Sequence, residues 1–312
     1  MISSLGQMEL AVENKPRDWS FLFAHISAAI ASLIAGFSVI LTSLAMDTMQ
    51  PVEATFIRYF FAFVCVVPFC VFYRTKIFSI SRRDFLAISA LGILFYFIFP
   101  MTFNKGLQLT TASRGALIMS LIPTLALLFG ALFKVEKLNV FKALGCLIAI
   151  AGVTIGVSSG LATTVSSSSI VMGDLFMLVA IFQAAIFSVF SRRYFQKYGA
   201  WLVSVVSIAI GFLVPSLFFV GISGINSVSN LSSSEVLYLL ILGTIGVPIQ
   251  FGLFAWSLSR LGPSRATMYI VLTPLSATFL AVAILNETVT SLFILGLLVV
   301  VLAIFLANRK DE

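Results

Sequence analysis

The chain has 312 residues, of which 60% are hydrophobic and only 10% are charged, and it carries a formal net charge of +7. Soluble globular proteins average about 25% charged residues, so the composition excludes a soluble domain. Apolar stretches of roughly 18 or more residues recur, each long enough to cross about 30 Å of hydrocarbon as a helix. The sequence therefore predicts an all-α integral membrane protein, and its positive charge needs no nucleic acid to explain it.

Ten spans can be placed in chain order, with edges set by the apolar runs: 20–45, 52–73, 85–104, 113–133, 138–158, 171–191, 200–221, 235–258, 264–285 and 290–307. Residues 1–18 are expected to form a tail before an uncleaved first span, since they lack the basic and apolar regions of a signal peptide. Two units of five spans, 19–158 and 171–307, flank a Ser-rich linker at 159–170, and 308–312 form a second tail.

The two units are copies of one sequence. The stretch from Ser113 to Glu136 returns from Ser264 to Glu287 at an offset of 151 residues, without a gap. Ser-Arg opens both stretches and a proline stands ten residues after each serine. This agreement at fixed spacing predicts a tandem duplication.

The positive charges predict the orientation of the spans. Sixteen Lys and Arg residues fall on one set of span ends, against only Lys105 and Arg114 on the other. Basic residues favour the cytoplasmic side, so both termini are expected to be cytoplasmic. Because each unit has an odd number of spans, the second must enter the membrane upside down. Inverted repeats of this kind are typical of transporters, which bind their substrate near the midplane between the halves.

Several segments resemble one known family. They are EATFIRYFFAF (Glu53–Phe63), which contains Arg58, GDLFMLVAIFQAAIFSVFSRR (Gly173–Arg193), and the two stretches that begin at Ser113 and at Gly262. In order and spacing they resemble the drug/metabolite transporter superfamily, in its EamA branch, across residues 19–307. The resemblance departs in the first span, where Gly36-Phe37 stands in place of a Trp-Gly pair.

The resemblance implies a secondary transporter of small polar or amphipathic metabolites, often amino acids and their relatives, and often an exporter. It implies a central cavity lined by spans 1, 3, 4, 6, 8 and 9. One similar branch imports S-adenosylmethionine, so uptake stays an alternative, as does a non-transporting receptor. A bacterial inner membrane is the expected location.

Among the charged residues, Arg58 is the only one predicted inside a span, and it either anchors the structure near the surface or contacts substrate. Arg114 and Arg265 each follow a serine that is expected to cap a helix, so both place a cation at a helix N-terminus, which opposes the helix dipole. Because this occurs at matching positions of the two repeats, it favours a gate contact or attraction of anionic groups, with an interfacial anchor as the alternative. Glu136 and Glu287 are expected to be anions at the N-terminus of the helix that follows each, with a coupling role as the alternative, and Asp174 is expected to be an acid at the start of span six.

The polar inventory near the midplane is small. Gln183 and Gln250 are the preferred substrate contacts, with hydrogen bonding between helices as the alternative. Pro123 and Pro274 predict kinks at matching points of spans four and nine, which mark a binding site in transporters or serve packing alone. Further candidates for binding or gating are Asn104, Ser120, Thr124, Thr273, Trp256 and Tyr269. The phenylalanines are expected mostly to face lipid or to pack.

Other classes of function find little support in the sequence. The single histidine and the lack of paired intramembrane acids argue against an enzyme, and no Gly-x-x-x-x-Gly-Lys loop appears for direct use of ATP. No cofactor or metal is expected. The expected partners are a small-molecule substrate and the lipid bilayer, without nucleic acid, and a homodimer stays open.

Overall fold

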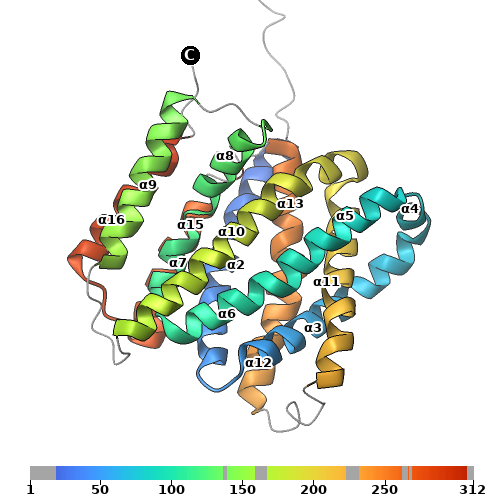
Figure 1. The fold of residues 1–312 in the computed structure, drawn as a ribbon, viewed down its shortest axis with the longest axis horizontal. Helices are drawn as coiled ribbons and strands as arrows, with labels where there is room; N and C mark the ends of the chain where they lie inside the picture. Colours follow the sequence, from blue (N-terminus) through green and yellow to red (C-terminus); the bar gives the residue numbers. More distant parts are fainter. Residues whose placement is uncertain are drawn as a thin grey trace, which may run out of the picture.

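The computed structural model describes residues 19–135, 139–158, 167–222, 232–261, 266 and 269–307. Within these ranges, seven helices are long and apolar enough to cross a membrane, and three shorter apolar helices accompany them. Figure 1 shows them gathered in one helical bundle. The predicted all-α membrane fold with ten spans is confirmed.

The elements of the first repeat are α2 (Trp19–Met46), α3 (Pro51–Phe72), the short α4 (Arg74–Phe78), α5 (Arg82–Ile93), η1 (Leu94–Ile98), α6 (Phe99–Leu109), α7 (Ala112–Met119), α8 (Ile122–Leu132) and α9 (Val140–Ser158). Those of the second are α10 (Ser167–Tyr198), α11 (Ala200–Ile222), α12 (Ser233–Thr244), η3 (Ile245–Ile249), α13 (Gln250–Leu261), η4 (Tyr269–Val271), α15 (Leu272–Leu285) and α16 (Ser291–Ala307).

The third and eighth spans each contain one π-helical turn, η1 and η3, at positions 94–98 and 245–249. These positions differ by the same 151 residues that relate the two copies of the sequence. Single π-helical turns inside α-helices occur frequently at functional sites. Both spans were predicted as uninterrupted helices, so the matched π-turns are a feature that the structure adds.

The fourth span is broken rather than kinked at its proline. Helix α7 ends at Met119, and α8 begins at Ile122 with Pro123 in its first turn. A proline ring clashes with the carbonyl four residues earlier, which here belongs to Met119, but is tolerated in a first turn. In the ninth span Pro274 is the third residue of α15, and the 3₁₀ turn η4 precedes it.

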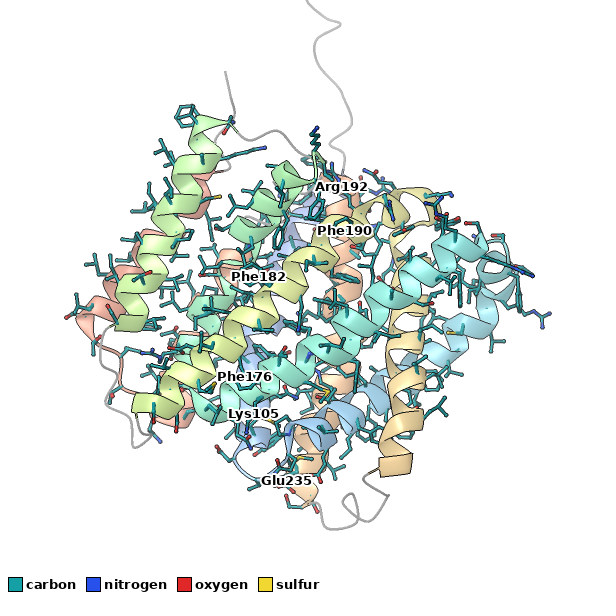
Figure 2. All side chains as sticks on the ribbon, in the orientation of Figure 1. Lys105, Phe176, Phe182, Phe190, Arg192 and Glu235 are labelled. Carbon is teal, nitrogen blue, oxygen red and sulfur yellow. The ribbon has the colours of Figure 1, made fainter. Side chains whose placement is uncertain are left out.

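The two repeats are inverted relative to one another. Figure 2 shows Arg192, near the end of α10, at one end of the bundle, which we call the basic end, and shows Lys105 and Glu235 at the opposite end. Lys105 lies near the end of the third span, whereas Glu235 lies in the first turn of the eighth. Equivalent spans therefore run in opposite directions.

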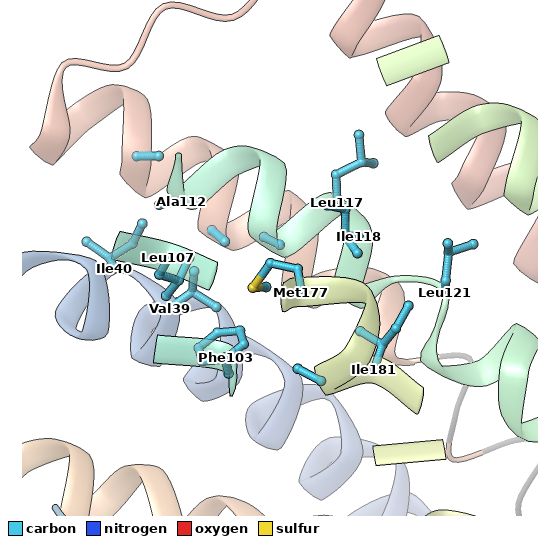
Figure 3. Close-up of a cluster of buried hydrophobic side chains, with 14 of the residues drawn as sticks. Val39, Ile40, Phe103, Leu107, Ala112, Leu117, Ile118, Leu121, Met177 and Ile181 are labelled. Atoms are coloured by element: carbon cyan, nitrogen blue, oxygen red, sulfur yellow. The ribbon is translucent and has the colours of Figure 1, made fainter. Parts of the chain in front are cut away.

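The main buried core lies where α2, α6, α7 and α10 meet. Figure 3 shows Val39, Phe103, Leu117, Met177 and Ile181 converging there from these helices. Because helices in lipid gain little from burying apolar surface against one another, close van der Waals packing must hold them together.

Glycines permit the most extensive helix contact in the described part of the chain. Helices α9 and α16 run together along one flank of the bundle (Figure 1). A Cβ atom built on Gly296 would lie only 2.5 Å from the Gly152 carbonyl oxygen and from the Gly156 amide nitrogen. The Gly-x-x-x-Gly pair on α9 and Gly296 on α16 therefore allow backbone-to-backbone contact.

Candidate functional site

A cavity of about 130 Å³ lies between the two repeats. One buried water needs about 10–15 Å³ measured in this way, so the cavity has room for a small organic molecule. Spans 1, 3, 4, 6, 8 and 9 contribute lining residues, and α3 adds Arg58. The polar lining residues are Ser32, Ser38, Thr42, Arg58, Ser188, Gln250 and Thr273, and the apolar ones are Ala31, Ala35, Val39, Phe95, Phe99, Pro100, Phe103, Met119, Ile122, Ala184, Phe251, Phe254 and Ile270.

Arg58 is a buried cation without a counter-ion in the described part of the chain. Arg58 is the eighth residue of α3, and it is only 8% exposed. Its Nη2 donates to the Gly246 carbonyl oxygen at 3.4 Å, while its Nε is buried without a hydrogen-bond partner. The guanidinium also lies 5.7 Å from the centre of the Tyr59 ring. The described residues show no ion pair between Arg58 and Glu53 or Asp47, the nearest acids in the sequence.

The second polar feature of the cavity is Gln250, the first residue of α13 after the π-turn η3. Its Oε1 accepts a hydrogen bond from Ser38 Oγ on α2 at 3.4 Å, and both side chains line the cavity. Gly246, whose carbonyl faces Arg58, belongs to η3 itself. The π-turn and the residue after it thus bind the guanidinium through the Gly246 carbonyl and the Ser38 hydroxyl through the Gln250 amide.

Part of the remaining wall is aromatic. Phe95, Phe99 and Phe103 recur every four residues along η1 and α6, so they share one helix face. Their rings stack in sequence, with centroids 5.1 Å apart for Phe95 and Phe99 and 5.7 Å apart for Phe99 and Phe103. Phe251 and Phe254 line the cavity from α13. The expectation that phenylalanines mostly face lipid or pack missed these five.

Of the twelve residues predicted for binding or gating, Arg58, Gln250 and Thr273 line the cavity. Gln183 instead accepts a hydrogen bond from Thr102 at 2.9 Å, which joins α10 to α6. Asn104 donates to Thr55 Oγ1 at 3.0 Å and is fully buried between the second and third spans. Gln183 therefore makes the hydrogen bond between helices that was its alternative interpretation, and Asn104 makes one as well.

Four predicted residues of the broken spans, Pro123, Pro274, Ser120 and Thr124, lie beside the cavity rather than in it. Ser120 caps the end of α7 by donating to the Leu117 carbonyl oxygen, and the carbonyl of Thr124 accepts a weak bond from Cys146 Sγ. Neither residue lines the cavity, nor do Pro123 and Pro274, although Met119, Ile122 and Thr273 next to them do.

The two aromatic candidates lie at the basic end. Tyr269 shares a 2.9 Å hydrogen bond with His25 Nδ1, which joins the ninth span to the first. Trp256 packs beside the small cluster of Ala24, Leu261 and Ala266. Neither residue is part of the cavity lining.

Arg114 takes part in a buried ion pair at the opposite end of the bundle. It binds both carboxylate oxygens of Asp174 on α10, and its Nη1 donates to the Val157 carbonyl oxygen at 2.6 Å. Thr110 also donates to Asp174, at 2.9 Å. The interpretation of Asp174 as a helix-start acid is wrong, because α10 begins at Ser167, two turns earlier. The pair connects the fourth span to the sixth and lies outside the cavity.

The N-terminus of α7 is bound by residues of both repeats. Thr111, not Ser113 as predicted, is the capping residue. Glu287 accepts hydrogen bonds from the backbone amides of Ala112 at 2.7 Å and Ser113 at 3.1 Å. Glu287 is therefore an anion at a helix N-terminus as expected, but the helix belongs to the first repeat. Arg265 and Glu136, the symmetry-related partners, lie outside the described residues.

Matching acids connect the repeats at the two ends. At the basic end Asp84, in the first turn of α5, accepts hydrogen bonds from Lys197 Nζ at 2.6 Å and Tyr198 Oη at 2.7 Å. At the opposite end Glu235, in the first turn of α12, accepts one from the Thr48 hydroxyl. Asp84 and Glu235 are 151 residues apart, so they are equivalent positions of the two repeats. We call these contacts the basic-end tie and the opposite-end tie.

The model of the EamA-like transporter family matches residues 22–158 and 171–309, which is one copy for each repeat. The chain belongs to the EamA-like transporter family. It is a membrane transporter and not an enzyme.

The relatives of this EamA-like chain extend over most of its length. The uncharacterized transporter YdfC of Bacillus subtilis is 30% identical over 69% of this chain and 68% of its own. The uncharacterized inner membrane transporter YicL of Salmonella typhimurium is 24% identical over 92% and 95%. A crystal structure at 17% identity superposes with a TM-score of 0.64 and covers 93% of this chain and 96% of its own, which supports the fold.

Proposed function

We propose that this EamA-like chain is a secondary transporter that exports a small polar or amphipathic metabolite of amino acid or derivative type by alternating access. The cavity between the repeats carries the proposal, because residues of both copies line it. Binding between inverted repeats lets one repeat move against the other around a fixed site. We place the chain in a bacterial inner membrane with both termini in the cytoplasm, supported by the charge asymmetry of the sequence and by the inner-membrane relative.

The gating part of the proposal rests on the broken spans. The α7–α8 break and the η4–α15 junction stand at matching points of the two repeats, and both contribute residues to the cavity. Broken helices in corresponding positions are the strongest sequence-level indicator of a transporter's binding site. In this proposal spans four and nine gate opposite faces, while the basic-end tie and the opposite-end tie open in turn.

The test compares metabolites in medium and cytosol between cells that produce the chain and cells with an empty vector. Enrichment of one compound class in the medium is the expected result. That class is then measured for flux with the purified chain in liposomes. Depletion from the medium with gain inside would instead favour uptake, as in the S-adenosylmethionine importers of similar sequence. Liposomes that show no flux of the enriched class would contradict the transporter proposal.

A further inference from the structure

We propose that the cavity takes an amphipathic monocarboxylate: a small molecule with one carboxylate, a planar apolar body and no free ammonium group. The inference narrows the proposed amino acid or derivative to derivatives that lack the free ammonium group, and in that sense rests on the proposed function. Three features carry it, namely the unpaired guanidinium of Arg58, the absence of acids from the described lining, and the unequal chemistry of the two repeats.

The first feature is the set of unused hydrogen-bond donors on the Arg58 guanidinium. A guanidinium has five N–H donors, yet this one makes a single long hydrogen bond, to the Gly246 carbonyl, and leaves Nε without a partner. A buried charge without compensation is costly, so an anion that enters the cavity would be strongly favoured. A carboxylate matches the planar fork of arginine, which binds its two oxygens through parallel hydrogen bonds.

The second feature is the charge balance. Arg58 is the only ionisable side chain among the described residues that line the cavity. One carboxylate brings the occupied cavity to neutrality. The ammonium group of a zwitterionic amino acid would find hydroxyls and the Gln250 amide but no counter-ion, and a phosphate dianion would leave one negative charge in excess. The cavity therefore selects a monoanion.

The third feature is that equivalent positions at the two π-turns carry apolar residues in one repeat and polar groups in the other. The 151-residue offset pairs Phe95 with Gly246, and Phe99 with Gln250. The first repeat thus presents two stacked rings where the second presents a bare backbone and an amide. A Cβ on Gly246 would lie 2.8 Å from Ser38 Oγ and 3.6 Å from Arg58 Nη2, so glycine keeps this space open.

The contrast extends to the first and second spans. The offset of 151 pairs Ser38 with Val189. Helices α3 and α11 instead match at an offset of 149, because a Cβ on Gly243 would meet the Arg58 carbonyl as one on Gly92 would meet that of Ser207. Arg58 therefore corresponds to the uncharged Ser207, while Ser38 and Gln250 correspond to apolar residues. A bound molecule is oriented by this contrast, with its carboxylate on Arg58 and its body against the stacked face of Phe95 and Phe99. Flat apolar groups pack well on such a face, which favours an aromatic or otherwise planar body.

A ligand series on the purified full chain in detergent tests the proposal without any substitution. Calorimetric titration measures 3-phenylpropionate, L-phenylalanine, 3-phenylpropan-1-ol and benzylphosphonate at a pH where the last is a dianion. We expect 3-phenylpropionate to bind at least about tenfold more tightly than each of the others, as the loss of a charge-assisted hydrogen bond predicts. Equal or tighter binding of any of the other three, or no binding of 3-phenylpropionate, would overturn the proposal.

Substitutions then locate the contact. Arg58→Gln is expected to weaken 3-phenylpropionate binding at least about tenfold, and Arg58→Lys less, because lysine keeps the charge without the fork. Arg260→Gln removes the same charge from an exposed position at the basic end and is the matched control. If Arg58→Gln does not fold, Arg58→Lys and the ligand series decide. Unchanged affinity in a folded Arg58 variant would overturn the proposal.

Flux in liposomes separates this inference from the proposed function. Carboxylate-selective binding without flux would uphold the cavity chemistry and contradict transport. Flux of other solutes without any preference for the monocarboxylate would uphold transport and overturn the inference.

Discussion

Gln250 and Gln183 are the same residue type, on spans eight and six, but their surroundings differ. Gln250 lines the cavity, whereas Gln183 bonds Thr102 outside it. We predict that Gln250→Leu raises the half-saturation concentration for the transported compound roughly two- to tenfold, the loss of one ordinary hydrogen bond. Gln183→Leu should leave it unchanged, because Thr102 also donates to the Phe99 carbonyl at 2.9 Å. Flux in liposomes measures both, and equal effects would contradict the site assignment.

Arg114 is predicted to act through stability instead. Arg114→Gln leaves Asp174 buried without its counter-ion, and such losses cost about 3–5 kcal/mol. Thermal unfolding in detergent should show a clearly lower midpoint than the exposed control Arg83→Gln, and adding Asp174→Asn should restore part of the loss. An Arg114→Gln protein as stable as its control would show that the pair contributes nothing.

At this scale the sequence could indicate which residues were unusual but only partly what they do. Arg58 stood out as a charge within a span, and it lines the cavity. Phe95, Phe99 and Phe103 recur every four residues, a pattern that was available in the sequence. Their face could not be assigned, because lipid and protein interior are both apolar, and hydrophobicity does not separate them.

At the scale of elements, span positions followed from apolar length, and both broken spans from their prolines. The exact break between α7 and α8 falls before Pro123, where its ring would clash with the preceding turn. The π-turns were not predictable in this way, since the segments LFYFI and IGVPI carry no shared local marker. Their equivalence appears only when the backbone of both repeats is known.

The α9–α16 pair gives a prediction at the same scale. Gly296→Ala would place a methyl group against the backbone of Gly152 and Gly156, which cannot move without separating the helices. We expect a lower unfolding midpoint than for Leu298→Ala, which trims an exposed side chain of the same helix. Since neither α9 nor α16 lines the cavity, the Gly296→Ala protein that remains folded should keep its ligand affinity. A loss of affinity without a loss of stability would contradict this division of roles.

At the scale of the whole molecule, the inverted repeat is the feature that the sequence predicted most completely, because its offset of 151 residues recurs in helices such as α6 and α13, in the π-turns and in the acids of the two ties. The ties themselves could not be predicted, since partners such as Asp84 and Lys197 lie 113 positions apart and belong to different repeats. They are unequal: a lysine and a tyrosine bind Asp84, whereas one threonine binds Glu235. Both carboxylates accept charge-assisted bonds, but Asp84 accepts two from the other repeat, one of them from a cation, so the basic end should be the harder to open.

Alternating access is tested most directly by the accessibility of the cavity from each face. Ala35→Cys lines the cavity, and it is placed in a chain whose Cys65, Cys70 and Cys146 are replaced by alanine. A membrane-impermeant thiol reagent is applied to inside-out and right-side-out vesicles, and the labelling rate from each face is measured. Asp84→Asn weakens the basic-end tie, so it should raise the labelling rate from the face at the basic end and lower the rate from the opposite face. Glu235→Gln should do the reverse. Rates that rise together at both faces, or that neither substitution changes, would contradict a carrier that opens to one side at a time.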